Sequence, residues 1–79
     1  MKEQKLKSDN NISIGKNIRE IRLRRKIGQT ELVRLLQLQG ISMTRETLVK
    51  IERGIQHIYA SQLKAIRDVL NTSYDELLK

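Results

Sequence analysis

Arg45, Glu46 and Lys50 are three charged residues whose spacing suits hydrogen bonding to a polar ligand. Residues 46 and 50 are one helical turn apart and residue 45 is adjacent, so in a helix the three side chains share one outer face. Arg and Lys can donate to guanine O6 and N7, and Glu can accept from cytosine N4. The pattern by itself predicts either a polar binding surface or an ordinary solvated charged face.

The chain has few residues suited to catalysis or metal binding. It contains no Cys, which excludes disulfides and thiolate zinc sites, and His57 is its only histidine. No Ser/Lys or Ser/His pair stands in a context typical of a catalytic pocket. We therefore expect a binding protein that is not an enzyme and that uses no metal or other cofactor.

The positive charge is concentrated in the first part of the chain. The net charge is +7; residues 1–56 contain 13 basic and 6 acidic side chains, whereas residues 57–79 contain three of each. This segregation favours a polyanionic partner, either a nucleic acid or, with less support, an anionic membrane surface. Charge that serves only solubility is the alternative interpretation.

Length and apolar spacing predict one small all-α domain. The 79 residues include no Pro, and apolar residues recur at helical spacing in several windows. Residues 1–12 are rich in Lys, Asn and Asp, which predicts a disordered basic N-terminal arm ahead of a domain over residues 13–79. The chain has no apolar run of about 18 residues and no signal-peptide pattern, so we expect a cytoplasmic protein without a membrane partner.

Five helices are expected, and they extend over about residues 14–26, 29–39, 45–53, 60–70 and 74–78. Ser13, Thr44 and Ser73 are suitable N-caps, the last as part of a capping box with Glu76. Gly40 is suited to the left-handed position after the second helix. The expected core comes from the apolar stripes of the helices, at Ile14, Ile18, Ile21, Leu32, Val33, Leu35, Leu36, Leu38, Leu48, Ile51, Leu63, Ile66, Val69, Leu70, Leu77 and Leu78.

Five stretches of the chain, in order, resemble the lambda-repressor-like (Cro/repressor-type, XRE) helix-turn-helix family. They are IGKNIREIR at 14–22, QTEL at 29–32, TLVKIERG at 47–54, LKAIRDVL at 63–70 and SYDELL at 73–78. The resemblance implies a compact five-helix lambda-repressor-like helix-turn-helix domain. It also implies a sequence-specific transcriptional regulator, expected to be a repressor, that binds double-stranded DNA at a two-fold operator as a homodimer.

The resemblance further implies three groups of functional residues. Those expected to contact bases from the helix at about 45–53 are Thr44, Arg45, Glu46, Thr47 and Lys50. Gln29 is expected to contact a phosphate, and Lys26 and Arg53 are expected either to contact phosphates or to be plain surface residues. Arg22 and Glu52 are expected to form a structural ion pair.

Two further expectations concern protein partners. The C-terminal third carries no net charge, so Tyr74, Leu77 and Leu78 are the expected surface of the homodimer. The alternative function is an antitoxin or co-regulator whose main role is to bind a partner protein, since one fold serves many functions. RNA binding is disfavoured, because two Tyr, no Phe and no Trp provide no platform for stacking bases.

Overall fold

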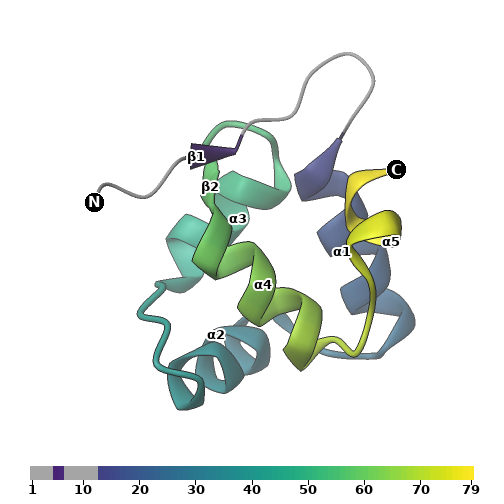
Figure 1. Cartoon of the computed structure of the whole chain (residues 1–79). Helices are drawn as coiled ribbons and strands as arrows, with labels where there is room; N and C mark the ends of the chain where they lie inside the picture. The colour runs from purple at the N-terminus through teal and green to yellow at the C-terminus, as the bar shows by residue number, and fades with distance from the viewer. Residues whose placement is uncertain (1–4, 7–12) are drawn as a thin grey trace.

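Five helices and one short pair of strands make up the part of the protein that a computed structural model describes, residues 5–6 and 13–79 (Figure 1). The elements are β1 (Lys5–Leu6), α1 (Ile14–Arg24), α2 (Gln29–Leu38), α3 (Arg45–Glu52), β2 (Ile58–Tyr59), α4 (Ala60–Val69) and α5 (Tyr74–Leu78). The mainly helical class and the five predicted helices are confirmed for these residues. α1 packs beside α3 and α5, and α2 packs beside α3 and α4.

The helix ends follow local chemistry at most of the predicted positions. Thr44 Oγ1 accepts a hydrogen bond from the Thr47 amide at 3.1 Å, and Ser73 Oγ accepts from the Glu76 amide at 3.2 Å. Gly40 has the predicted left-handed backbone, with a φ of 82°. Ser13 precedes α1, but its side chain makes no capping hydrogen bond, so this part of the prediction is wrong.

α1 ends two residues earlier than predicted. Lys26, expected to be its last residue, has a φ of 58° and lies beyond the helix. The Lys26 amide donates to Leu23 O at 3.0 Å, and the Ile27 amide donates to Arg22 O at 3.1 Å. These two bonds form a Schellman motif, which satisfies the last carbonyl groups of the helix and turns the chain toward α2.

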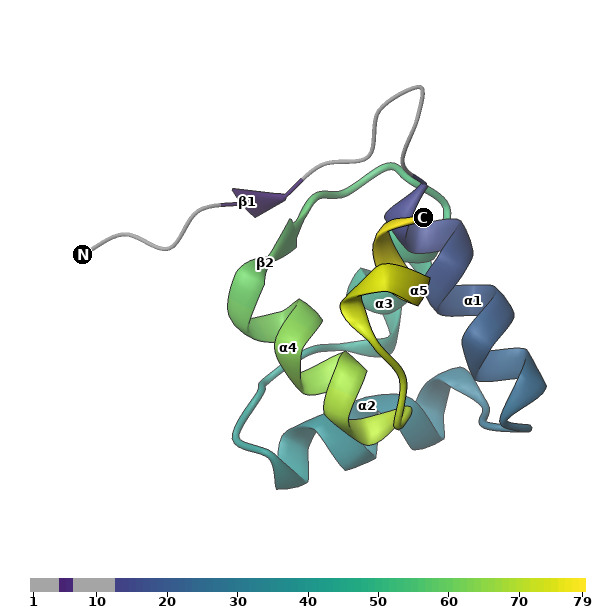
Figure 2. The same cartoon turned by 45° about the vertical axis from the view of Figure 1, so that its right-hand side comes forward.

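The strand pair was not predicted. Lys5 pairs with Tyr59 and Leu6 pairs with Ile58 in antiparallel register, and β1 lies alongside β2 in Figure 2. Two-residue strands are too short to show alternating hydrophobicity, so the sequence contains no signal for them. The rest of the predicted disordered arm, residues 1–4 and 7–12, lies outside the described residues.

One hydrophobic core lies between the helices. Most of the predicted apolar stripes are buried, and Met43, Ile58 and Ala65 join them. Leu35 is only half-buried and lies outside the core, Leu38 is 73% exposed and Leu78 is 36% exposed, so none of the three belongs to the core as predicted. Leu38 is the last residue of α2 and Leu78 the last of α5, where the chain leaves the neighbouring helices.

α1 and α3 lie very close together at Gly15. A Cβ atom on Gly15 would collide with the carbonyl oxygen of Ile51 in α3. Glycine is therefore needed at this position, because any side chain would push the two helices apart. The close approach sets the position of α3 against the rest of the domain.

α5 is held to α1 and α4 by polar contacts. Asn17 is buried in α1, and its Nδ2 donates to Leu77 O at 2.9 Å and to Lys79 O at 3.1 Å. The guanidinium of Arg67 in α4 lies 4.5 Å from the centre of the Tyr74 ring. An arginine is a cation at neutral pH, and a hydrogen bond to Asp68 raises the pKa of Arg67 further, so the contact with the ring is a cation–π interaction.

Candidate nucleic-acid interface

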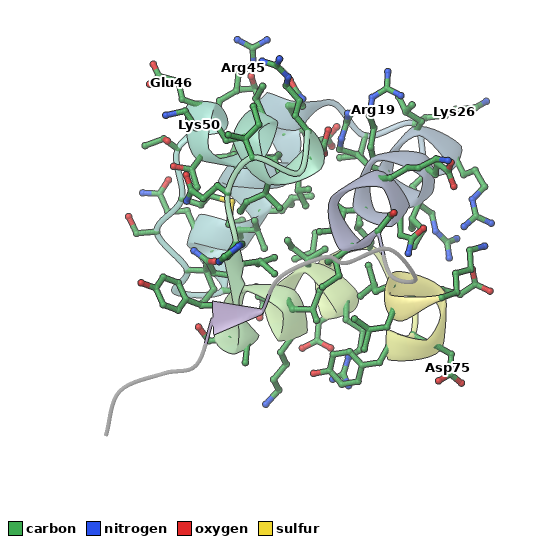
Figure 3. The ribbon with its side chains drawn as sticks, turned by 90° about the horizontal axis from the view of Figure 1, so that it is seen from above. Arg19, Lys26, Arg45, Glu46, Lys50 and Asp75 are labelled. Atoms are coloured by element: carbon green, nitrogen blue, oxygen red, sulfur yellow. The ribbon has the colours of Figure 1, made fainter. Side chains whose placement is uncertain are left out.

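The outer face of α3 carries the three charged residues that the sequence placed together. Arg45, Glu46 and Lys50 are all exposed, and Figure 3 shows them projecting from α3 away from the body of the domain. Because all three belong to a helix whose first turn is capped, their Cα positions are fixed while the side chains extend into solvent. The face can donate and accept hydrogen bonds at neighbouring points.

A shallow hollow of about 230 Å³ lies on this face. Arg45, Glu46 and Lys50 line it together with Arg53, the residue after α3, and with half-buried Val49. Val49 is the apolar member among four charged side chains. The hollow thus offers three cations, one carboxylate and a patch of aliphatic surface.

Thr44 and Thr47 contact each other at the start of α3. Thr44 Oγ1 accepts from the Thr47 amide and also donates to Thr47 Oγ1 at 3.0 Å. Both predicted base-contacting threonines are therefore engaged within the first turn. Their geometry stiffens the end of the helix from which Arg45 and Glu46 project.

Cations of α1 and its C-terminal turn lie on the same side of the molecule. Figure 3 shows Arg19 and Lys26 projecting to the side on which Arg45 and Lys50 lie, whereas Asp75 of α5 lies on the opposite side. Arg19 was not predicted as a site residue, because the resemblance implied no role for it. Its position on α1, off the apolar stripe, is the signal in the sequence that identifies it.

Gln29 has a partner within the protein. It is the first residue of α2, and its Nε2 donates to Glu52 Oε1 at 3.2 Å. The amide NH₂ group has two N–H bonds, so one remains for another acceptor. The predicted phosphate contact at Gln29 would therefore share the side chain with a structural role.

Arg22 and Glu52 form a buried, two-pronged ion pair. Arg22 Nε lies 2.8 Å from Glu52 Oε2, and Nη2 lies 2.9 Å from Oε1. Arg22 Nη1 also donates to the carbonyl of Ile27 at 2.9 Å. The cluster joins the end of α1, the turn before α2 and the end of α3, and so fixes the direction in which α3 presents its outer face.

Of the three residues predicted to form the dimer surface, one is buried and two are partly exposed. Leu77 is fully buried in the core, where no partner can contact it, so this residue was wrongly assigned. Tyr74 and Leu78 are 38% and 36% exposed. In a helix as short as α5, one face packs against the domain and only the other remains accessible.

Neither a membrane-crossing helix nor a cluster of three His, Asp or Glu side chains able to hold a metal ion occurs within residues 5–6 and 13–79. Comparisons with known protein families, with curated proteins and with solved structures found no match. Any function assigned to the face of α3 therefore depends on the geometry and charge of its own side chains.

Proposed function

We propose that this protein is a sequence-specific transcriptional regulator of the lambda-repressor-like, helix-turn-helix type, which binds double-stranded DNA through α3. The observation that carries the proposal is the exposed set of Arg45, Glu46 and Lys50 on a capped helix, on the same side as Arg19 and Lys26. An α-helix fits the major groove of B-DNA, and these side chains match the hydrogen-bonding groups displayed there.

These side chains make two kinds of contact with DNA in the proposed complex. Arg45 and Lys50 donate to guanine, and Glu46 accepts from cytosine N4, which gives sequence preference. Arg53 at the end of α3 and Lys26 in the turn after α1 contact phosphates, which positions the protein without reading sequence. Gln29 adds a neutral hydrogen bond to a phosphate at the start of α2, where the positive end of the helix dipole favours an anion.

The scaffold holds the reading helix in one orientation before DNA arrives. The Arg22–Glu52 pair fixes the end of α3, and the contact at Gly15 fixes its distance from α1. A preorganised helix loses little conformational entropy on binding, so more of the contact energy appears as affinity.

The proposed regulator acts as a repressor and a homodimer. One recognition helix contacts only a few base pairs, which is too little for specificity among genomic sites. Two copies related by a two-fold axis double the readout, with half-sites about one helical turn apart. The proposed contact surface between the two copies contains Tyr74 and Leu78. Both belong to the C-terminal third of the chain, which carries no net charge.

The test is selection of bound sequences from a random duplex pool with the full chain. We expect enrichment of a motif with two-fold symmetry, and its loss when Arg45 and Lys50 are both replaced by Ala. Lys64→Ala, at an exposed position of α4, is the control and should enrich the wild-type motif. If the wild type enriches no motif, the alternative function as an antitoxin or co-regulator that binds a partner protein takes its place.

A further inference from the structure

Val49 is a half-buried residue of α3 that lines the hollow on the outer face of the helix. Within the described part of the chain, Val49 is not among the partly buried apolar side chains that pack against the core, which are Ile27, Val33, Ile41 and Val69. Valine is also a weaker helix former than alanine or lysine, because its branched Cβ restricts the χ1 angle. Neither core packing nor helix formation therefore explains a valine at this position.

Val49 is surrounded by charged side chains. Residues 45, 49 and 53 follow one ridge of α3 and residues 46 and 50 follow the next, because side chains four positions apart lie above one another in a helix. The four charged residues are exposed, and Figure 3 shows Arg45, Glu46 and Lys50 projecting beyond the helix. The hollow between the two ridges thus has an apolar floor at Val49 and a charged rim.

The rim and the floor together restrict what can occupy the hollow. Three cations and one carboxylate form the rim, and no ion pair within residues 5–6 and 13–79 includes any of the four, so the rim favours a polyanion. The volume of about 230 Å³ is below the range of about 300–1,000 Å³ typical of small-molecule sites. A fitting occupant is therefore a polyanion that displays a small apolar group.

The C5 methyl group of thymine is the apolar group that base edges display in the major groove of DNA. We propose that Val49 is a specificity-determining residue that receives a thymine methyl group in the hollow. α3 then prefers an A·T pair beside the bases that Arg45, Glu46 and Lys50 contact. This role of Val49 rests on the proposed DNA binding by α3 and adds to it a base contact made by an apolar side chain. Cytosine carries hydrogen at C5 and leaves Val49 uncovered.

The first experiment uses the duplex that the random-pool selection enriches, with each thymidine in turn replaced by deoxyuridine. The replacement removes the methyl group and keeps the O4 acceptor and the base pair. We expect the affinity of the wild type to fall about fourfold at one position in each half-site, the effect of one buried methyl group. If no replacement changes the affinity, the inference is overturned and the proposed function stands, whereas a pool without an enriched motif overturns both.

The second experiment assigns the effect to the residue. V49A should bind the thymidine and deoxyuridine duplexes nearly equally, and α3 stays folded because alanine is the better helix former. V33A is the matched control, since it removes the same atoms from a half-buried valine that packs against the core, and it should keep the fourfold preference. A full preference for thymidine in V49A would place the methyl group against another side chain. Loss of the preference in V33A as well would mean that the packing of α2, and not contact by Val49, sets it. Either result would overturn the inference.

Discussion

Glu52 connects three helices of the domain. Its carboxylate accepts from Arg22 of α1 through two bonds and from Gln29 of α2 through a third. Both side chains of the ion pair are buried, at 6% and 2% exposure. Removing one partner leaves the other charge without compensation in a place that water cannot reach.

Glu52→Ala should therefore lower the free energy of unfolding by about 3–5 kcal/mol, the usual cost of breaking a buried pair. The measurement is urea or thermal unfolding followed by circular dichroism. Glu20→Ala, an exposed acidic residue of α1, is the control. A loss in Glu52→Ala no larger than in Glu20→Ala would show that the pair does not support the fold.

Base contacts and phosphate contacts should respond differently to substitution. Replacing Arg45, Glu46 or Lys50 by Ala should cost about 1–3 kcal/mol on the preferred site and relax preference at one position in each half-site. Glu46→Ala differs from the other two on non-specific DNA, because it removes a negative charge. Affinity for a panel of single-base operator variants measures the effect. If all three variants kept the wild-type preference, α3 would not be the reading helix.

Lys26→Ala and Arg53→Ala should weaken binding to all sequences alike. Each should also make the dependence of log affinity on log salt shallower by about one unit per lost contact. Gln29→Ala removes no charge and should leave the salt dependence nearly unchanged. Titrations at two salt concentrations separate these effects, and a relaxed sequence preference in Lys26→Ala would contradict its role as a phosphate contact.

At the scale of elements, the spacing between α1 and α3 depends on one glycine. Gly15 faces the backbone of Ile51, and a backbone atom cannot move aside as the end of a side chain can. In an open helix Ala is better than Gly by about 1 kcal/mol. At position 15 the backbone of Ile51 leaves no room for a Cβ atom, so Gly is more stable there than Ala.

Gly15→Ala should destabilise the domain by about 1–3 kcal/mol, as overpacking does in other cores. It should also weaken DNA binding, because α3 is displaced. Gly28→Ser is the matched control: no atom lies within 4 Å of a Cβ there, and Ser is a good N-cap for α2. Unfolding midpoints for both variants provide the measurement, and equal stability of Gly15→Ala and the wild type would show that the helices can separate without cost.

At the scale of the whole molecule, the exposed face of α5 is the proposed contact between two copies. Leu78→Glu should weaken the assembly of two proteins on one duplex, because it places a charge in an apolar contact. Leu38→Glu, an even more exposed leucine at the end of α2, is the control and should assemble normally. The mass of the complex at saturation reports the stoichiometry, and a single wild-type protein per duplex with a one-half-site footprint would rule out the dimer.

The sequence by itself determined the local features. The five helices, the caps at Thr44 and Ser73 and the left-handed Gly40 all depend on residues within about four positions of one another, where periodicity and hydrogen bonding act directly. The outer face of α3 was equally predictable, because residues 45, 46 and 50 share a face in any helix. The excess of basic residues was also evident without a structure.

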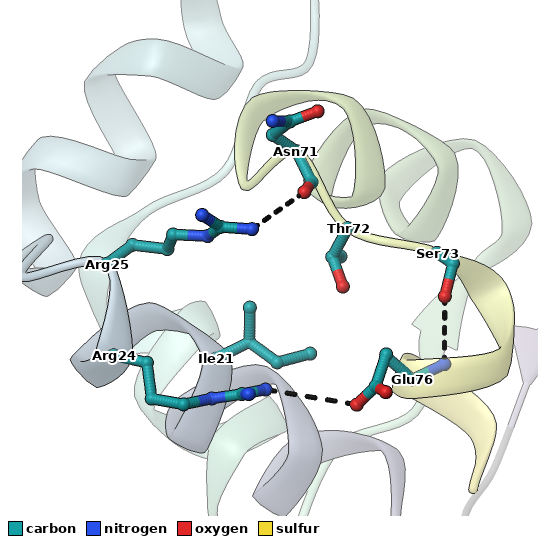
Figure 4. A pocket seen from close by; sticks show the side chains of 7 residues that line it. All are labelled: Ile21, Arg24, Arg25, Asn71, Thr72, Ser73 and Glu76. Atoms are coloured by element: carbon teal, nitrogen blue, oxygen red, sulfur yellow. Dashed lines mark hydrogen bonds and ion pairs between the residues drawn. The ribbon is translucent and has the colours of Figure 1, made fainter.

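Only the tertiary structure decided which side chains meet across the chain. It buries Leu77 and exposes Leu78 and Leu38, engages Gln29 with Glu52, and pairs β1 with β2. Asn17 and Gly15 gain their roles from helices far along the chain, and Arg25 donates a hydrogen bond to the carbonyl of Asn71 (Figure 4). The physical reason is that the hydrophobic effect has no direction. Apolar spacing specifies which face of a helix is buried, whereas the partner, the distance and the polar contacts follow only when all the helices pack at once.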